Sequence, residues 1–246
     1  MAMMKFTSSG PAPQKSDMDS HRRLIGRIGL YVPAILIVLV LWRDGPEIWG
    51  RLDSVSAYYY SGAVAVLTGM LVTLALFLFT YDGYRNDEDH WADRLCSIVA
   101  GVAALGVALF PTSAPEGIPA LPWVKPWVVK LHFGSALVLF VMFAVFCLWL
   151  FRKTGKEQAP DLNKKISNVF YLFSGLVIVA CIAWAFYNRL RGESIFWPES
   201  WALIFFACSW LVKGGEPSLV YGWLRSLFPR AEVDGEDEEI SKRSGG

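Results

Sequence analysis

The segment LHFGSALVLFVMFAVFCLWLF, residues 131–151, carries no Asp, Glu, Lys or Arg, and its one histidine, His132, lies at its start. A helix needs about 20 mostly apolar residues to cross the hydrocarbon core of a bilayer. Because lipid offers no hydrogen-bonding partner, the backbone groups of such a run must be satisfied within the segment, as they are in a helix. The segment therefore predicts a transmembrane helix.

Five further stretches share this apolar character. With 131–151, the predicted spans are 24–42, 60–80, 93–110, 169–187 and 198–212. The composition agrees, since 54% of the residues are hydrophobic and only 18% are charged, against about 25% charged in a typical soluble domain. The predicted fold class is an all-α polytopic membrane protein with a bundle of six transmembrane helices.

The first span is the least regular of the six. It contains Arg27, which we expect to extend toward the lipid headgroups, and Pro33. The basic residues before it would also suit a signal peptide. However, no small-x-small cleavage site follows the apolar core, so an uncleaved helix is the favoured interpretation.

The basic residues indicate the orientation of the bundle. Of the 23 Lys and Arg residues, 17 lie in the two terminal segments and the 81–94 and 152–168 loops, and six lie on the opposite side. Cytoplasmic loops carry the excess of Lys and Arg in membrane proteins. We therefore expect a multi-pass protein of the inner (plasma) membrane with both termini cytoplasmic.

Four regions follow from this plan. Residues 1–22 are polar and rich in Pro and Ser, and they predict a disordered cytoplasmic N-terminus. Residues 23–213 form the six-helix transmembrane domain. Apolar residues recur at helical spacing in 214–230, which predicts an amphipathic helix lying in the interface. Residues 231–246 predict a disordered acidic tail.

Polar side chains gather at the predicted outer ends of the spans, which places them at one membrane depth. They are Asp53, Ser56, Tyr58, Tyr59, Tyr60, His132, Ser135, Asn188 and Glu199. Such a cluster predicts a shallow ligand-binding pocket for a lipid or small amphiphile. The ordinary alternative is favoured, because Tyr is enriched at membrane interfaces and Ser or Asp before a helix is a cap. Three consecutive tyrosines also point about 100° apart on a helix, so they cannot all line one pocket.

His132 is the one histidine in this cluster. As a general base it would need an orienting acid, for which Asp53 and Glu199 are the candidates. A metal or haem site would need further histidines nearby, but His21 and His90 lie on the opposite side. A hydrogen-bonding histidine at a helix end is therefore the favoured interpretation, and no catalytic residue is assigned.

The sequence predicts no metal and no cofactor. Asp89 and Asp93 would share a helix face that could bind a divalent cation, but acids in a first turn also complement the helix dipole, and this second role is favoured. No Asp, Glu, Lys, Arg or His lies in the middle third of any span, which argues against proton-coupled transporters and pumps. The net charge of +1 and the lack of a basic stripe argue against a nucleic-acid partner, and none is predicted.

Several segments resemble those of bacterial six-helix integral membrane proteins with no assigned function. They are SVSAYYYSG, LFLFTYDGY, VALFPT, LHFGSALVLF and SWLVKGG, and the likeness spans most of residues 50–215. The plan is more faintly similar to that of DRAM-like membrane proteins. Ceramidase-like membrane hydrolases are set aside, because their HxxxH pair is missing here. The resemblance implies a fold and a location, with no chemistry.

Three functions remain open at this point. The first is a non-enzymatic membrane protein that binds a lipid or small amphiphile in the outer pocket. The second is a structural or accessory subunit whose small residues, such as Gly62, Gly69, Gly101, Ala104 and Ala108, pack against a membrane-protein partner or a second copy. The third and least favoured is an enzyme acting on a lipid headgroup. Membrane lipids are the expected partners in each case.

Overall fold

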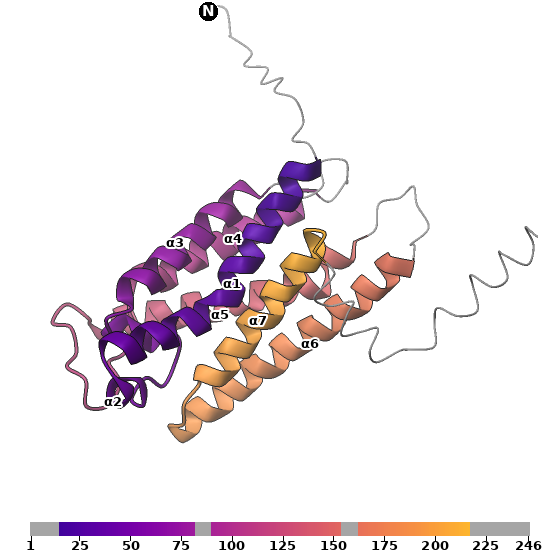
Figure 1. Ribbon diagram of the computed structural model, residues 1–246. Helices are drawn as coiled ribbons and strands as arrows, with labels where there is room; N and C mark the ends of the chain where they lie inside the picture. The colour runs from indigo at the N-terminus through magenta and orange to yellow at the C-terminus, as the bar shows by residue number, and fades with distance from the viewer. Residues whose placement is uncertain (1–14, 82–89, 154–161, 217–246) are drawn as a thin grey trace, which may run out of the picture.

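The computed structural model describes residues 15–81, 90–153 and 162–216, and this part of the chain contains helices and turns but no strand. The prediction of an all-α protein is thus confirmed. The elements, labelled in Figure 1, are α1 (Lys15–Arg43), α2 (Pro46–Trp49), η1 (Ser56–Tyr60), α3 (Val64–Thr80), α4 (His90–Leu109), α5 (Pro126–Leu148), η2 (Leu150–Arg152), α6 (Leu162–Arg191) and α7 (Phe196–Lys213).

Four of the described helices, α1, α4, α5 and α6, are long and apolar enough to cross a membrane. Helix α3 is apolar but has 17 residues. Helix α7 has 18 residues, with Glu199 in its first turn and Lys213 in its last. The chain therefore has the helices of a membrane protein, with α3 and α7 as its two shorter members.

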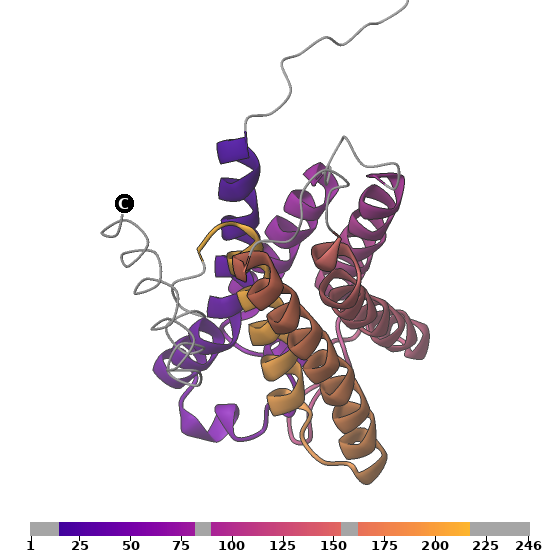
Figure 2. The same ribbon diagram turned by 90° about the vertical axis from the view of Figure 1, so that its right-hand side faces the viewer.

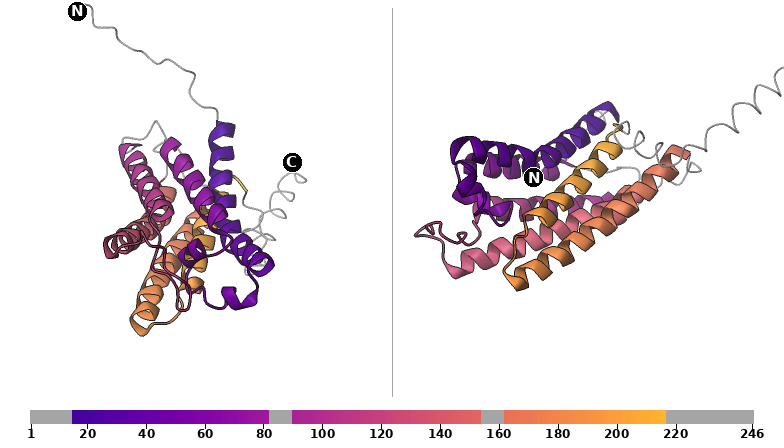
Figure 3. Two further views of the ribbon diagram at one scale, coloured as in Figure 1. Left: turned by 90° about the vertical axis from the view of Figure 1, so that its left-hand side faces the viewer. Right: turned by 60° about the horizontal axis from the view of Figure 1, so that its bottom comes forward.

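These six helices form a ring in which each packs against its neighbours in the chain, and α7 closes the ring by packing against α1. Figures 2 and 3 show them running side by side. Because successive helices alternate in direction, their ends fall at two ends of the bundle. The terminal end holds the start of α1 and the end of α7, whereas the tyrosine end holds α2 and η1 (Figure 1).

Glycines lie where neighbouring helices approach most closely. A Cβ at Gly26 of α1 would lie 2.9 Å from the backbone oxygen of Ala207 in α7, and one at Gly101 of α4 would lie 2.7 Å from the Phe79 ring of α3. Gly69 was also expected to pack, but a Cβ there would meet nothing within 4 Å. The packing of α3 against α1 and α4 decides which face of α3 is directed inward. The prediction for Gly69 used residue type alone, and it was therefore wrong.

Aromatic side chains fill the contact between α5 and α7. The rings of Phe143 and Phe206 stack with centroids 3.6 Å apart. Trp210 lies one turn farther along α7, and its ring centroid is 5.0 Å from those of Tyr81 and Phe151. Trp210 is fully buried. This cluster joins α7 to α5 across the ring and reaches the terminal end of the bundle.

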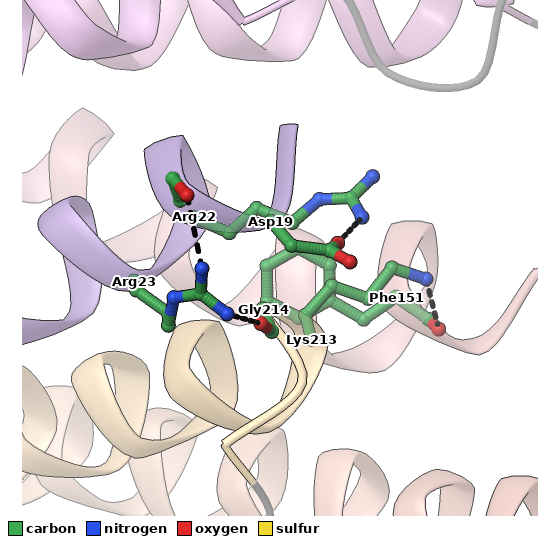
Figure 4. Close-up of polar contacts among 7 residues, drawn as sticks. Asp19, Arg22, Arg23, Phe151, Lys213 and Gly214 are labelled. Atoms are coloured by element: carbon green, nitrogen blue, oxygen red, sulfur yellow. Dashed lines mark hydrogen bonds and ion pairs between the residues drawn. The ribbon is translucent and has the colours of Figure 1, made fainter. Parts of the chain in front are cut away.

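All six helix starts differ from the predicted spans: α1, α4, α5, α6 and α7 begin earlier than predicted, and α3 begins later. Helix α1 begins at Lys15, inside the segment predicted to be disordered; an ion pair between Arg22 and Asp19 (3.0 Å; Figure 4) helps to hold this first part of the helix, and residues 1–14 lie outside the description. The second span was predicted from Tyr60, but α3 begins at Val64, because the extended backbone of Ser61 separates it from η1. Most of the predicted interfacial helix and the whole acidic tail lie outside the described residues.

Candidate functional site at the tyrosine end

The three tyrosines lie on a short 3-10 helix instead of on a membrane helix. Ser54 caps this turn by accepting a hydrogen bond from the Ala57 amide (3.0 Å), and the Ser61 hydroxyl donates to the carbonyl of Tyr58 (2.7 Å). Tyr58 is fully buried, whereas Tyr59 and Tyr60 are partly exposed. The turn therefore directs one tyrosine inward, as expected for residues that cannot all share one face.

Backbone contacts join the segment before η1 to the connection between α6 and α7. The carbonyl of Asp53 accepts hydrogen bonds from the Ile195 amide (2.7 Å) and the Ser194 hydroxyl (2.9 Å). The Asn188 side chain donates to the carbonyl of Ser194 (2.7 Å). Asp53 and Asn188 are thus brought close together, and their hydrogen bonds hold the α6–α7 connection in place. Asp53 is an exposed residue.

Glu199 connects α7 to the same segment. Its carboxylate is buried and accepts a hydrogen bond of 2.7 Å from the amide of Val55, a residue 144 positions earlier in the chain. Three residues earlier on α7, the ring of Phe196 packs against Tyr58 with centroids 5.8 Å apart. Because Phe196 and Glu199 are about one turn apart, they share a face of α7 that is directed at η1.

Two buried hydroxyls accompany Glu199. Those of Tyr58 and Ser200 make no hydrogen bond of normal geometry with any described residue. Burial raises the pKa of Tyr58 to about 12, and the nearby Trp49 side chain opposes this shift only in part. A hydroxyl withdrawn from water without a partner costs free energy, about 1–3 kcal/mol. These two hydroxyls are therefore the buried polar groups of the site whose hydrogen bonding is least satisfied.

The remaining predicted residues lie on the other side of the tyrosine end. The Tyr60 hydroxyl donates to the carbonyl of Thr112 (2.7 Å), and His132 Nδ1 lies 2.6 Å from the carbonyl of Phe110. These contacts tie η1 and α5 to the segment after α4. His132 is hydrogen-bonded, but it lies in the second turn of α5, which begins at Pro126, and not at the helix end that the prediction assumed. No described contact joins it to Asp53 or Glu199.

Ser135 belongs to a helix contact. Its side chain touches Gly106, where α4 and α5 cross, so it packs between helices. Tyr59 contacts Tyr60, with ring centroids 6.1 Å apart. The predicted cluster thus separates into an η1–α7 group, comprising Asp53, Ser56, Tyr58, Asn188 and Glu199, and a group around His132 and Tyr60.

Sequence reasoning missed Ser200, which lies beside Glu199 in the segment FWPES. A signal was present, because Ser200 lies four residues after Phe196 and therefore on the same helix face. Among the described residues, no group of three His, Cys, Asp or Glu side chains could hold a metal ion. Asp93 forms an ion pair with Lys153 (2.9 Å), while Asp89 lies outside the described ranges.

A family model described as "Protein of unknown function (DUF998)" matches residues 54–212, which is more than half of the chain. The cation-efflux pump FieF of Salmonella typhi is 24% identical over 239 residues, covering 90% of this chain and 72% of the pump. FieF of Cronobacter sakazakii is 24% identical over 192 residues, covering 72% of this chain and 59% of that pump. No solved structure matches.

Proposed function

This chain belongs to the DUF998 family, whose function is unknown, and we propose that it is a six-span inner-membrane protein that binds a lipid or small amphiphile at the tyrosine end. Both termini are cytoplasmic in this proposal. The observation that carries the binding function is that the hydroxyls of Tyr58, whose ring packs against Phe196, and of Ser200, which follows Glu199 on α7, are both buried.

The packing of the two shorter helices supports six spans. Helix α7 packs along both α1 and α6, and α3 packs along α1 and α4, so each has two long apolar neighbours. At 1.5 Å per residue, 17 or 18 residues extend about 26 Å, close to the hydrocarbon thickness of about 30 Å. The bias of Lys and Arg toward the terminal end supports its cytoplasmic placement.

Reporter fusions test this topology in a bacterial host. Green fluorescent protein fused after Gly246 should fluoresce, because it folds in the cytoplasm. Alkaline phosphatase, which is active only outside the inner membrane, should be active when fused after Gly192, in the exposed turn between α6 and α7. The reverse pattern would overturn the orientation, and two reporters on one side would overturn the crossing of α7.

The chemistry of the η1–α7 group suits the polar end of an amphiphile. Glu199 uses one carboxylate oxygen for the Val55 amide, and the two hydroxyls can both donate and accept. The Tyr58 and Phe196 rings lie against each other beside these groups and supply apolar surface. A ligand with a hydroxyl or amine head and an apolar body would satisfy the polar atoms while its body remains in lipid.

Native mass spectrometry of the protein purified from membranes in mild detergent tests this binding. We expect a retained molecule of defined mass. Tyr58→Phe and Ser200→Ala should each reduce its occupancy about fivefold, since one hydrogen bond contributes about 1 kcal/mol. Ser209→Ala is the matched control: Ser209 is buried on the same helix, and its hydroxyl already donates to Phe205 (2.9 Å).

The other outcomes separate the alternatives. A protein without a retained mass, or one whose ligand is unaffected by both substitutions, would overturn the pocket. A stoichiometric protein partner in the same spectrum would instead favour the accessory-subunit function. We expect both variants to keep the fold, because neither hydroxyl makes a hydrogen bond of normal geometry with a described residue.

The likeness to cation-efflux pumps favours a second candidate function, the transport of a cation. Its support is the shared sequence alone. The same spectra, supplemented by elemental analysis of the purified protein, test it. A bound metal ion at one or more per chain would favour this candidate over the amphiphile, and metal-free protein with a retained lipid would count against it.

A further inference from the structure

Arg189 lies near the end of α6, between the two groups of polar residues at the tyrosine end. Its guanidinium carbon is 3.6 Å from the centre of the Phe133 ring of α5. It is also close enough for its charge to act on His132 of α5 and on Glu199 of α7. The Arg189 side chain therefore lies where α5, α6 and α7 come together at this end of the bundle.

The other arginine at the end of α6 is fully engaged, whereas Arg189 is not. Arg191 donates to the Glu193 carboxylate (2.9 Å) and to the Tyr187 hydroxyl (3.0 Å). Arg189 is exposed and makes no hydrogen bond or ion pair with any described residue. A guanidinium carries several N–H donors in a planar fork, and stacking on a ring holds this fork in place. The donors of Arg189 are therefore available to an acceptor from outside the chain.

The Glu199 carboxylate supplies the opposite charge. One of its oxygens accepts from the Val55 amide (2.7 Å), and the other has no hydrogen bond with a described residue. Only 9% of Glu199 is exposed, and a buried carboxylate is costly unless donors or a cation satisfy it. Arg189 acts on this carboxylate only through its charge, and the nearby charge of Asp53 opposes that effect. A cationic donor at the second oxygen would therefore stabilise Glu199.

We propose that the amphiphile at the tyrosine end is a phospholipid with a primary ammonium head, such as phosphatidylethanolamine, whose ammonium binds Glu199 and whose phosphate binds Arg189. This inference rests on the proposed function and names its ligand. An ammonium group only donates hydrogen bonds, which suits the second oxygen of Glu199. Phosphate oxygens accept from a guanidinium fork in charge-assisted hydrogen bonds. The two groups of such a head are joined by a short linker, so they need opposite charges on neighbouring helices, as α6 and α7 provide.

The surface beside Arg189 favours a lipid over a soluble ligand. Phe186 precedes Arg189 by three residues on α6 and so shares its helix face. It is 65% exposed. Arg189 itself lies just beyond residue 187, the predicted end of the span, which is the depth at which headgroups lie. A phosphate bound to Arg189 would therefore place its acyl chains along the apolar surface of α6. Free phosphoethanolamine presents the same polar chemistry without these chains, and the test distinguishes the two sources.

Native mass spectrometry of the delipidated full-length protein, titrated with dioctanoyl phosphatidylethanolamine, tests this assignment. We expect Arg189→Gln to weaken binding about tenfold, because it removes charge-assisted hydrogen bonds to the phosphate. Arg191→Gln is the matched control. Arg191 is also exposed at the end of α6, but Glu193 and Tyr187 occupy its donors, so its loss should change binding less than about twofold.

Two further lipids separate the roles of the two charges. Dioctanoyl phosphatidylglycerol has the phosphate but no ammonium, and dioctanoyl phosphatidylcholine has a cation without N–H donors. Each should bind the wild type about tenfold more weakly than the ethanolamine lipid. Glu199→Gln should weaken binding of the ethanolamine lipid about tenfold and leave phosphatidylglycerol within about twofold, whereas Arg189→Gln should weaken both.

Three results would overturn the proposal. The first is equal binding of the three lipids, and the second is wild-type binding by Arg189→Gln. The third is displacement of the ethanolamine lipid by an equal concentration of free phosphoethanolamine, which would assign the site to a soluble ligand.

Conservative variants keep these outcomes readable. Arg189→Lys, which keeps the charge, should bind within about threefold of the wild type. Glu199→Gln keeps an oxygen for the Val55 amide, and circular dichroism identifies any variant that fails to fold.

The proposed function and this inference fail in different ways. A retained molecule that is lost in Tyr58→Phe and Ser200→Ala but is not an ammonium phospholipid would overturn the inference and leave the proposed function intact. A protein that retains no molecule and binds none of the three lipids would overturn both.

Discussion

Trp210→Ala should cost about 3–5 kcal/mol of stability, the range for removing a fully buried large aromatic side chain. Trp210 has no exposed surface and contacts the rings of Tyr81, Phe146 and Phe151. Its loss opens a cavity where α5 and α7 meet. For a chain of this size we expect the thermal unfolding midpoint in a fixed detergent to fall by about 10 °C or more.

Trp201→Ala supplies the matched control. It removes the same side chain from the same helix, but 45% of Trp201 is exposed, and its closest described ring neighbour, Phe205, is 6.4 Å away. We expect this variant to unfold within about 3 °C of the wild type. Equal shifts for the two variants would show that α7 is not packed against α5 as described.

Gly26→Val should cost about 2–3 kcal/mol, within the usual range for adding side-chain volume to a packed contact. A Cβ at this position would lie 2.7 Å from Leu211 Cγ and 2.9 Å from the backbone oxygen of Ala207. The leucine can change rotamer, but the backbone oxygen moves only if α1 and α7 separate. That contact closes the ring, so the variant should lose heat stability and migrate as an expanded particle in size-exclusion chromatography.

Gly69→Val tests whether crowding, and not the loss of glycine, causes this effect. Gly69 of α3 is exposed, and a Cβ there would meet nothing within 4 Å. We expect its stability to stay within about 0.5 kcal/mol of the wild type, as for other uncrowded surface positions. A tolerated Gly26→Val would contradict the close approach of α1 and α7.

The helical class and the positions of the long apolar helices could be predicted from the sequence. Hydropathy is a local property, and the requirement that lipid imposes on backbone hydrogen bonds converts an apolar run into a helix without reference to the rest of the chain. The predicted ends of the helices were less accurate than their positions. Helix α1 begins at Lys15, nine residues before the predicted span, and α3 begins at Val64 because the chain turns at η1.

For the candidate site, the sequence could predict only which residues lie at the same end of the bundle. Position relative to the spans placed Asp53, Tyr58 and Glu199 at one end of the bundle, and the three tyrosines were expected to diverge. Their partners could not be predicted, because the Glu199 carboxylate binds the Val55 amide 144 residues away and Asp53 acts through its carbonyl. Ser200 gained importance only once α7 was seen to face η1.

What the sequence alone determined is therefore the helix content, the apolar lengths and the separation of polar residues into two end layers, since each depends on a few neighbouring residues. The tertiary structure decided which residues within a layer meet: Tyr58 with Phe196, Gly26 with Ala207, and Lys164 with Lys213 on the carbonyl of Phe151. These contacts join helices that are distant in the chain. They are fixed by the order of helices around the ring, which no local pattern encodes.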